Sequence, residues 1–542
     1  MGATRHHHEF EATAVKIQPI VILLIAATLG WTLYNANRDG RQDDTQALHV
    51  LAGSELKDIE PLLPQLEKET GVRLKLDYTG TLDGAEQIAQ AGPQGGARYP
   101  LAWFSHAKYL ELLESARGRI VAREKIGLSP VIIGVRQSLA QRWGWDRTPP
   151  SWSDLAARAA SGELRYAMTN PTSSNTGFSA LIALIAALSS DPENFTLSEA
   201  QQGTVKDFFK GQRLTAGSSG WLAEAYVRDQ DRLDGLINYE SILLQMNRSG
   251  QLREPLTLIY PREGVVTADY PLLLLDAGKR AEYDKVIAWL RRPEIQERLM
   301  RETDRRPILP SVALEPRFTA RSLIELPFPG QRSVVDRILT AYLDEQRIPA
   351  HAYFVIDLSG SMRGEGIAAL KTALLNLMGG DTSLTGQFAR FRAREELSFV
   401  PFRDRVEPPV EMTIGSGADT ETSLKQARDF AQGLDPTGGT AIYSALTEAY
   451  ARIQQAQGQQ PDHYYSIVLM TDGMNTAGID LDQFIAYYRG LPEATRAVKI
   501  FPILFGEADT VAMQKLAEMT GGKVFDGNKN LAAAFKAIRG YQ

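Results

Sequence analysis

The sequence predicts an α/β protein built from two consecutive modules in which strands and helices alternate. Short apolar runs such as residues 48–52 and 353–356 end in turns rich in glycine, serine or aspartate, and a helical pattern follows each of them. Such alternation places helices on the faces of mostly parallel sheets. A chain of 542 residues is long enough for two or three domains.

The composition is that of an ordinary globular protein, with 44% hydrophobic and 23% charged residues. A net charge of −6 without any basic run argues against a nucleic-acid partner. The chain has no cysteine, which excludes disulfides, thiolate metal sites and cysteine nucleophiles. This composition fits a bacterial protein that works outside the cytoplasm.

The amino-terminal region contains one apolar segment between two polar ones. Residues 1–16 form a polar tail, and residues 17–34 are an uncharged run close to the minimum length of a bilayer-spanning helix. Trp31 and Tyr34 suit the membrane interface. We expect an uncleaved transmembrane anchor rather than a cleaved signal peptide, although the flanking positive charges are too balanced to orient it. Residues 35–46 are a polar linker.

The first module, expected over residues 47–332, opens with a βαβ unit. A strand at 48–52, an amphipathic helix at 59–70 and an alternating strand at 72–78 follow one another. Turn residues come after each strand. Further strands or apolar segments lie at residues 101–105, 120–125, 130–135, 166–168 and 256–260. One helix is expected to start at residues 152–155, and another covers residues 178–188.

This order of elements resembles the two-lobed fold of periplasmic solute-binding proteins, in which residues 130–135 would cross to the second lobe. The resemblance implies a cleft between the lobes for a small solute or anion. Hydroxyls and backbone N–H groups at helix starts can hold an anion, but the loops lack Arg and Lys, which argues against a highly charged ligand. The candidate cleft residues are Gly53, Ser54, Thr79, Gly80, Thr81, Ser105, Ser173, Ser174, Asn175, Thr176 and Tyr239.

Residues 333–347 are expected to form a connecting helix between the modules. Five prolines between residues 307 and 329 keep the preceding segment extended. No flexible Gly/Ser linker separates the modules, so we expect a packed interface.

The second module, residues 348–542, contains the most specific pattern. The strand at 353–356 runs into a tight loop in which Asp357, Ser359 and Ser361 place a carboxylate and two hydroxyls at alternate positions. Oxygen ligands without sulfur or imidazole suit Mg²⁺, or Mn²⁺, rather than zinc.

Two later segments complete this pattern. Thr440 opens a helix after two glycines, and Asp472 ends the apolar strand at 465–471. Because ligands collect beyond the carboxyl ends of parallel strands, we expect the three segments to converge there.

The Asp-x-Ser-x-Ser loop, the later threonine and the later aspartate resemble the metal-ion-dependent adhesion site of von Willebrand factor A domains. The resemblance implies a doubly wound, Rossmann-like sheet. It also implies a metal that keeps one position for an acidic residue of a partner protein. The candidate metal ligands are Asp357, Ser359, Ser361, Thr440 and Asp472.

The remaining elements of this module alternate as the resemblance requires. Strands are expected at residues 396–402, 410–414, 465–471, 499–505 and 523–526, and helices at 366–378, 422–434, 440–455, 480–491, 510–520 and 530–539.

We predict a single-pass protein of the bacterial inner membrane whose soluble modules lie outside the cytoplasm and bind a solute and a protein. An assembly or regulatory subunit of a transporter or AAA-type machine is the alternative. No Walker-type nucleotide motif occurs in the chain, so another protein would supply the energy.

A metal-assisted hydrolase is a further alternative that we do not favour, so the prediction is not an enzyme. The nearby acidic candidate for a general base, Glu365, is expected to start a helix. His351 is expected at the surface, at the opposite end of the sheet from the metal loop.

Overall fold

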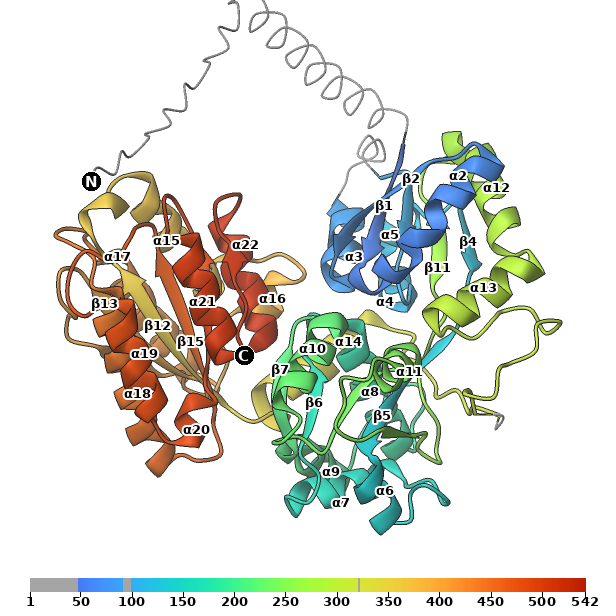
Figure 1. The fold of residues 1–542 in the computed structure, drawn as a ribbon, viewed down its shortest axis with the longest axis horizontal. Helices are drawn as coiled ribbons and strands as arrows, with labels where there is room; N and C mark the ends of the chain where they lie inside the picture. The colour runs from blue at the N-terminus through green and yellow to red at the C-terminus, as the bar shows by residue number, and fades with distance from the viewer. Residues whose placement is uncertain (1–46, 91–98, 320–321) are drawn as a thin grey trace, which may run out of the picture.

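The computed structural model describes residues 47–90, 99–319 and 322–542. The first module forms two lobes, each around its own sheet, and the second module lies beside them as a further α/β domain (Figure 1). Within these ranges no helix combines the length and apolar character needed to cross a bilayer. The anchor expected over residues 17–34 lies outside the described residues.

The first lobe is built on a five-stranded sheet in the order β2-β1-β3-β11-β4. β1 pairs in parallel with β2 and β3, whereas β11 returns from the second lobe and runs antiparallel to β3 and β4. The strands are β1 Leu48–Gly53, β2 Leu74–Thr79, β3 Leu101–Trp103, β4 Ala122–Lys125 and β11 Pro271–Leu274. The lobe's larger helices are α2 Leu63–Thr70, α3 Thr81–Gln90, α12 Arg280–Leu290 and α13 Pro293–Thr303.

The helix expected at 59–70 differs in its first half. A 3₁₀ segment, Ser54–Leu62, precedes α2 and contains Pro61. Proline lacks the N–H that an α-helix interior needs, so the regular helix begins only at Leu63. It ends at Gly71, whose φ of 71° is the left-handed conformation that glycine adopts at helix ends.

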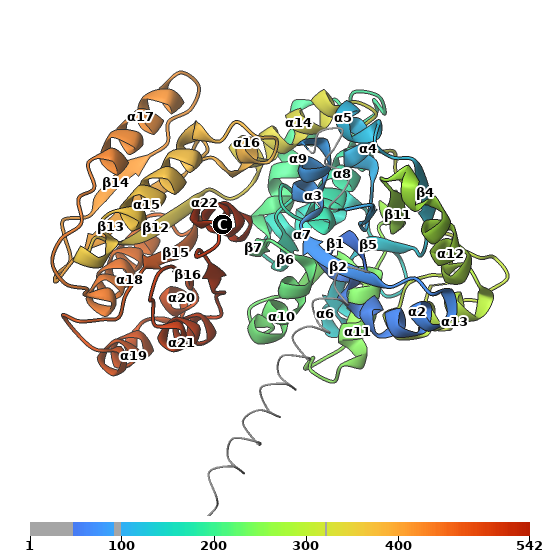
Figure 2. The same ribbon diagram turned by 90° about the horizontal axis from the view of Figure 1, so that it is seen from above.

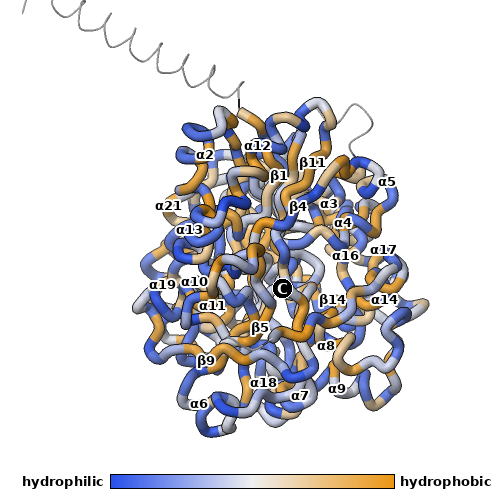
Figure 3. Tube along the Cα trace, turned by 90° about the vertical axis from the view of Figure 1, so that its right-hand side faces the viewer, coloured by the Kyte–Doolittle hydropathy of each residue, from blue (hydrophilic) through white to orange (hydrophobic). Residues whose placement is uncertain are grey.

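The second lobe has a six-stranded sheet that includes β5, which is the predicted crossover strand. The order is β10-β5-β8-β6-β7, and β9 also pairs with β5. The strands are β5 Ser129–Arg136, β6 Tyr166–Thr169, β7 Gln212–Ala216, β8 Gly235–Tyr239, β9 Leu256–Ile259 and β10 Thr267–Ala268. The principal helices are α7 Trp152–Ala160, α8 Asn175–Leu188, α9 Glu199–Lys210, α10 Ser219–Asp229 and α11 Glu240–Arg248. Figure 3 shows hydrophobic residues concentrated along β1, β11 and β5.

The connecting segment contacts both neighbours. It is α14, Arg332–Ala341, followed by a π-helical turn over Tyr342–Gln346. The ring of Tyr342 lies 4.9 Å from that of Phe209 in the second lobe. Asp344 accepts two hydrogen bonds of 2.7 Å from the Arg392 guanidinium in the second module. This helix therefore holds the second lobe and the second module together.

The second module has a six-stranded sheet in the order β14-β13-β12-β15-β16-β17. All neighbours are parallel except the edge strand β14, which is antiparallel to β13. The strands are β12 Ala350–Asp357, β13 Glu396–Phe402, β14 Val410–Thr413, β15 Tyr464–Thr471, β16 Lys499–Leu504 and β17 Phe525–Asp526. The main helices are α15 Glu365–Leu375, α17 Asp419–Gln432, α18 Ile442–Gln459, α19 Leu481–Gly490, α21 Thr510–Thr520 and α22 Leu531–Ile538.

Helices cover both faces of this sheet, and the central strand β12 is buried throughout. Phe354 belongs to the core beneath α15, α17 and α22, whereas its neighbour Val355 belongs to the core beneath α18, α19 and α21. Alternate residues of a strand point to opposite faces, so a continuous apolar run is what a two-sided core requires.

One residue expectation is wrong. His351 is buried, with 5% of its surface exposed, because β12 begins at Ala350 rather than at Tyr353. Its Nε2 lies 2.9 Å from Ser398 Oγ, and its ring stacks on Tyr353 at 4.5 Å.

The second module also contacts both lobes, and Figure 2 shows its helix α22 on the side that faces them. Asn170 Nδ2 of the second lobe donates to the Arg539 carbonyl at 3.2 Å. Glu86 of the first lobe accepts from the Leu384 N–H at 2.7 Å. These contacts confirm that the modules are packed together rather than loosely tethered.

Candidate metal centre and solute cleft

Three segments meet at the carboxyl edge of the second module's sheet. β12 and β15 are parallel neighbours, so their ends, Asp357 and Thr471-Asp472, lie side by side. The loop carrying Thr440 joins them: Thr437 N donates to the Leu358 carbonyl at 2.7 Å, and Gly360 N to the Gly438 carbonyl at 3.0 Å. Gly438 has a φ of 78°, a conformation that favours glycine at this close approach.

Hydrogen bonds link four of the five predicted ligands. Asp357 Oδ1 accepts from the Ser359 N–H at 2.8 Å, and its Oδ2 accepts from Thr471 Oγ1 at 2.6 Å. Ser359 Oγ lies 3.0 Å from Ser361 Oγ, which in turn donates to Asp472 Oδ1 at 2.8 Å. The two carboxylates are therefore linked through the backbone N–H of Ser359 and the hydroxyls of Ser359 and Ser361.

The fifth predicted ligand, Thr440, lies at the same place. A methyl group built on Gly473 would lie 3.8 Å from Ser361 Oγ and 4.0 Å from Thr440 Oγ1, so both hydroxyls flank this glycine. The backbone of Thr440 is fixed by Thr476, whose Oγ1 accepts from the Thr440 N–H at 2.9 Å.

The carboxylates are electrostatically uncompensated. Asp357 is fully buried and Asp472 is 8% exposed. Burial raises the pKa of both, and the charge of Asp472 raises that of Asp357 further. Neither carboxylate forms an ion pair with any described residue.

The donor set fits a hard divalent cation. Two carboxylates and three hydroxyls supply only oxygen, as Mg²⁺ or Mn²⁺ prefers. The described residues contain no cluster of three or more His, Cys, Asp or Glu side chains, so the cation proposed below would depend on the hydroxyls as well.

Sequence reasoning missed two supporting residues. Thr471 orients Asp357 and Thr476 anchors Thr440, yet neither belongs to the motif. The signal for Thr471 is its position as the polar last residue of a strand, directly after the apolar run at residues 467–470.

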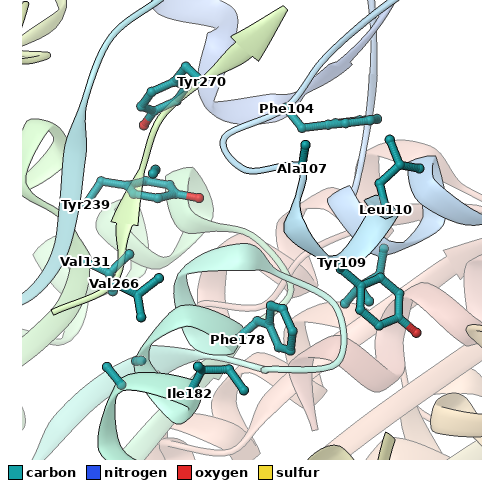
Figure 4. Packing of buried hydrophobic residues seen from close by; sticks show 14 of the residues in the cluster. Phe104, Ala107, Tyr109, Leu110, Val131, Phe178, Ile182, Tyr239, Val266 and Tyr270 are labelled. Carbon is teal, nitrogen blue, oxygen red and sulfur yellow. The ribbon is translucent and has the colours of Figure 1, made fainter. Parts of the chain in front are cut away.

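In the first module, three predicted cleft residues join the lobes. Tyr239 OH, at the end of β8, donates to Ser105 Oγ of the first lobe at 2.8 Å and accepts from Asn175 Nδ2 at 3.2 Å. All three are at least 95% buried. Figure 4 shows Tyr239 beside Tyr270, and their ring centroids are 6.1 Å apart. At the rim, a methyl group on Gly80 would lie 3.2 Å from the Ser173 carbonyl oxygen.

Other predicted cleft residues have local roles. Thr176 Oγ1 lies 2.7 Å from Thr169 Oγ1 and 3.2 Å from Ser174 Oγ, all within the second lobe. Thr79 Oγ1 accepts from Gln87 at 3.4 Å. Thr81 begins α3, and Gly53 and Ser54 form the junction of β1 with the 3₁₀ segment. For these residues the structure provides no contact across the lobes.

Charged groups outside the predicted set also lie where the lobes meet. Glu55 Oε1 accepts from the Ser105 N–H at 3.1 Å, and burial raises the pKa of Glu55. Arg305, which lies far away in the sequence, donates to Asp58 Oδ2 at 2.7 Å and stacks on Tyr270 at 4.4 Å. A guanidinium is therefore present near the junction of the lobes, although it is paired with Asp58.

Fold and site together define a two-lobed ligand-binding domain followed by a doubly wound domain with an oxygen-donor centre. Residues 48–302 match the family model described as bacterial extracellular solute-binding protein, and residues 352–536 match that of the von Willebrand factor type A domain. The chain thus carries a solute-binding domain and a von Willebrand A domain, as the sequence predicted.

Curated relatives match over a limited region. Inter-alpha-trypsin inhibitor heavy chain H4 of Sus scrofa is 29% identical over 134 residues, which is 24% of this chain and 13% of the relative. Heavy chain H2 of Mesocricetus auratus is 30% identical over 138 residues, again 24% and 13%. The chain therefore spans only about an eighth of the length of these relatives.

Solved structures with a similar fold include two binding proteins. The periplasmic binding protein AfuA from Actinobacillus pleuropneumoniae, with exogenous fructose-6-phosphate bound, has 17% identity and a TM-score of 0.43 over 55% of this chain and 98% of its own. The ferric binding protein from Campylobacter jejuni has 12% identity and a TM-score of 0.42 over 54% and 96%.

Proposed function

We propose that this chain is an extracytoplasmic binding protein with two linked binding activities. Its first module captures a small polar solute, and its von Willebrand A domain holds Mg²⁺, or Mn²⁺, to dock a protein partner. The observation that carries the proposal is the convergence of two unpaired carboxylates and three hydroxyls at one edge of the second sheet.

In this proposal Asp357, Ser359, Ser361, Thr440 and Asp472 hold the cation. A bound cation would offer a remaining coordination position to a carboxylate supplied by the partner. The hydroxyls add no charge, so two carboxylates leave a divalent ion without excess negative charge around it. Thr471 and the Ser359 N–H keep Asp357 aimed at the centre.

The solute would be recognised mainly through hydrogen bonds. Tyr239, Ser105 and Asn175 offer hydroxyl and amide groups where the lobes meet. Glu55 adds a carboxylate, and the guanidinium of Arg305 is already paired with Asp58. This set favours a polar molecule with hydrogen-bond donors over a polyanion.

We further propose that residues 17–34 anchor the protein in the bacterial inner membrane with both modules outside the cytoplasm. The apolar run supports the anchor, and the description of the family matching residues 48–302 supports the location. We propose binding rather than catalysis as the role. The position of Glu365 supports this, since it is exposed in the first turn of α15, where its charge favours the helix.

Titration of the full chain with Mn²⁺, followed by electron paramagnetic resonance, tests the metal centre. One saturable site is expected, and Asp357→Ala should abolish it while exposed Glu365→Ala should not. A wild-type chain without a saturable site, or an unchanged site in Asp357→Ala, would refute the centre.

Peptide display on the full chain tests the docking role. Peptides recovered in Mg²⁺ and released by EDTA should contain Glu or Asp, and Asp357→Asn should not select them. Recovery that does not respond to EDTA would contradict metal-dependent docking.

A further inference from the structure

A cavity of about 600 Å³ lies between the second lobe and the von Willebrand A domain. β7 lines it on one side, and α20, Glu493–Arg496, with the starts of β15 and β16 lines it on the other. Figures 1 and 2 show β7 on the side of its lobe that faces the von Willebrand A domain. The strand starts lie at the opposite edge of the sheet from the metal centre. The volume of the cavity is in the range of small-molecule sites, which often occur between domains.

The walls combine apolar and cationic groups. Leu214, Leu233 and Val498 are buried apolar residues that line the cavity. Four cationic side chains line the cavity: Arg165, Arg213, Arg232 and Lys499. Two carboxylates, Asp229 and Glu493, line it as well. Positive charge therefore exceeds negative charge around this space.

Cations crowd one side of the cavity. Lys499 Nζ, whose side chain is 9% exposed, pairs with Asp229 Oδ2 at 2.7 Å. A methyl group on Gly521 would lie 3.1 Å from Lys499 Nζ and 3.9 Å from Arg228 Nε, so two cations share this neighbourhood. Burial lowers the pKa of Lys499, and the charges of Arg228 and Arg232 lower it further.

The remaining cations differ in how far they are neutralised. Arg165 is bound to Asp234 at 2.9 Å and Arg232 to Glu493 at 3.1 Å. Arg213 is exposed and forms no ion pair with any described residue. One guanidinium at the cavity is thus available without breaking an existing pair.

We propose that this cavity is a second small-molecule site, which binds an organic anion carrying at least two negative charges, as phosphate or carboxylate groups. Such an anion would meet Arg213 of the second lobe and Lys499 of the von Willebrand A domain. Charge-assisted hydrogen bonds are the strong polar contacts in such sites. Because both sides contribute, the ligand would stiffen the joint between the two domains.

Calorimetric titration of the full chain, without divalent cations, tests the site. Pyrophosphate and citrate are the two anionic probes, and sucrose is the uncharged control. We expect saturable binding of at least one anion and none of sucrose. The anion that binds more tightly shows whether the site prefers phosphate or carboxylate groups.

Matched charge reversals locate the binding. Arg213→Glu should weaken anion binding about tenfold or more, whereas Arg142→Glu, an exposed arginine of the same lobe outside the cavity, should leave it unchanged. Glu493→Ala, which removes a carboxylate from the rim, should strengthen it or leave it unchanged.

Three results would overturn the proposal. They are the absence of saturable anion binding at millimolar concentration, equal weakening by Arg142→Glu and Arg213→Glu, and weakening by Glu493→Ala. The Asp357→Ala variant should bind the anion as the wild type does, so the outcome of this test does not depend on whether the proposed metal centre exists.

Discussion

Asp357 and Asp472, the two acidic side chains of the candidate metal centre, repel each other across a network of hydroxyls. Ser361 donates to Asp472, and Thr471 and the Ser359 N–H donate to Asp357, but these bonds leave both charges in place. Removing charged groups from water is costly unless an opposite charge compensates. A divalent cation would supply that compensation. Removing one of the carboxylates should therefore affect stability differently with and without the metal.

The substitution Asp472→Asn should separate these two conditions. Without a divalent cation it should leave the melting temperature equal to or above that of wild type, because one of two repelling charges is removed while an acceptor for Ser361 remains. With Mg²⁺ the wild type should gain stability by mass action and the variant should not. Thermal unfolding in EDTA and in Mg²⁺ provides both measurements. An equal Mg²⁺ response in the two proteins would contradict the role of Asp472.

His106 predicts acid sensitivity in the first lobe. It is 2% exposed, and burial, with the charges of Lys108 and Lys125, lowers its pKa to about 3. Between that value and an unfolded pKa of about 6.5, the unfolded chain binds more protons, so stability falls as the pH falls.

Between pH 7 and pH 4, the free energy of unfolding of the His106→Asn variant should therefore fall by about 3 kcal/mol less than that of the wild type. Asparagine can still accept from the Lys108 N–H, as His106 Nδ1 does at 3.3 Å. Denaturant unfolding at both pH values measures the difference. The partly exposed His49 offers a control as His49→Asn, and an identical pH profile for both variants would contradict the assignment.

Single residues were predictable where a motif names them. The five candidate ligands come together at one edge of the sheet, as expected because parallel strands bring their carboxyl ends together. Their binding of a metal stays a prediction. Glu55 and Arg305 were not predictable in this way. Their proximity arises only when β11 and the segment after α13 return to the first lobe, and no local pattern encodes that return.

At the scale of elements, strongly apolar strands such as β12 and β15 were predictable to within a few residues. α3 was not predicted, because Gly84 weakens its helical signal. The structure gives the reason for this glycine: a methyl group there would lie 2.6 Å from the Phe104 ring. Tertiary packing has thus selected a residue that local propensity disfavours.

α3 also carries the acidic group that binds the second module. Glu86 is 6% exposed and accepts from the Leu384 N–H at 2.7 Å, the Thr385 N–H at 3.3 Å and the Thr385 hydroxyl. Lys536 of α22 lies 3.7 Å away. The contact therefore joins α3 to two elements of the von Willebrand A domain.

The substitution Glu86→Ala should cost about 3 kcal/mol of unfolding free energy, because it leaves buried donors unpaired. Glu67→Ala, which removes an exposed carboxylate from α2 of the same lobe, should cost little. Thermal unfolding of both variants measures the difference. Equal melting temperatures for the two variants would show that this interface contributes nothing to stability.

At the scale of the whole molecule, the two lobes and the von Willebrand A domain meet at Ser173. Gly80 of the first lobe approaches its carbonyl from one side, and Gly540 approaches its hydroxyl from the other. Tyr541 then packs on Trp221, with ring centroids 4.9 Å apart. A change in the angle between the lobes would therefore alter the contacts of this last turn of the chain.

The substitution Gly540→Leu should loosen this junction. A side chain there would begin 2.8 Å from Ser173 Oγ and 3.1 Å from the Gly217 Cα, so the second lobe and the von Willebrand A domain must move apart. Gly458→Leu is the control, because nothing lies within 4 Å of a methyl group at that position.

The chain has no native cysteine, so spin labels on Glu67→Cys, Gln202→Cys and Lys425→Cys, taken in pairs, report the three distances between the lobes and the domain. Gly540→Leu should lengthen the distance between labels 202 and 425. It should also broaden the distribution of distances between labels 67 and 202, since the two lobes lose their common contact at Ser173. If only the first distance changes, the domain rests on the second lobe without bracing the first. If neither changes, the junction at Ser173 does not hold the molecule together.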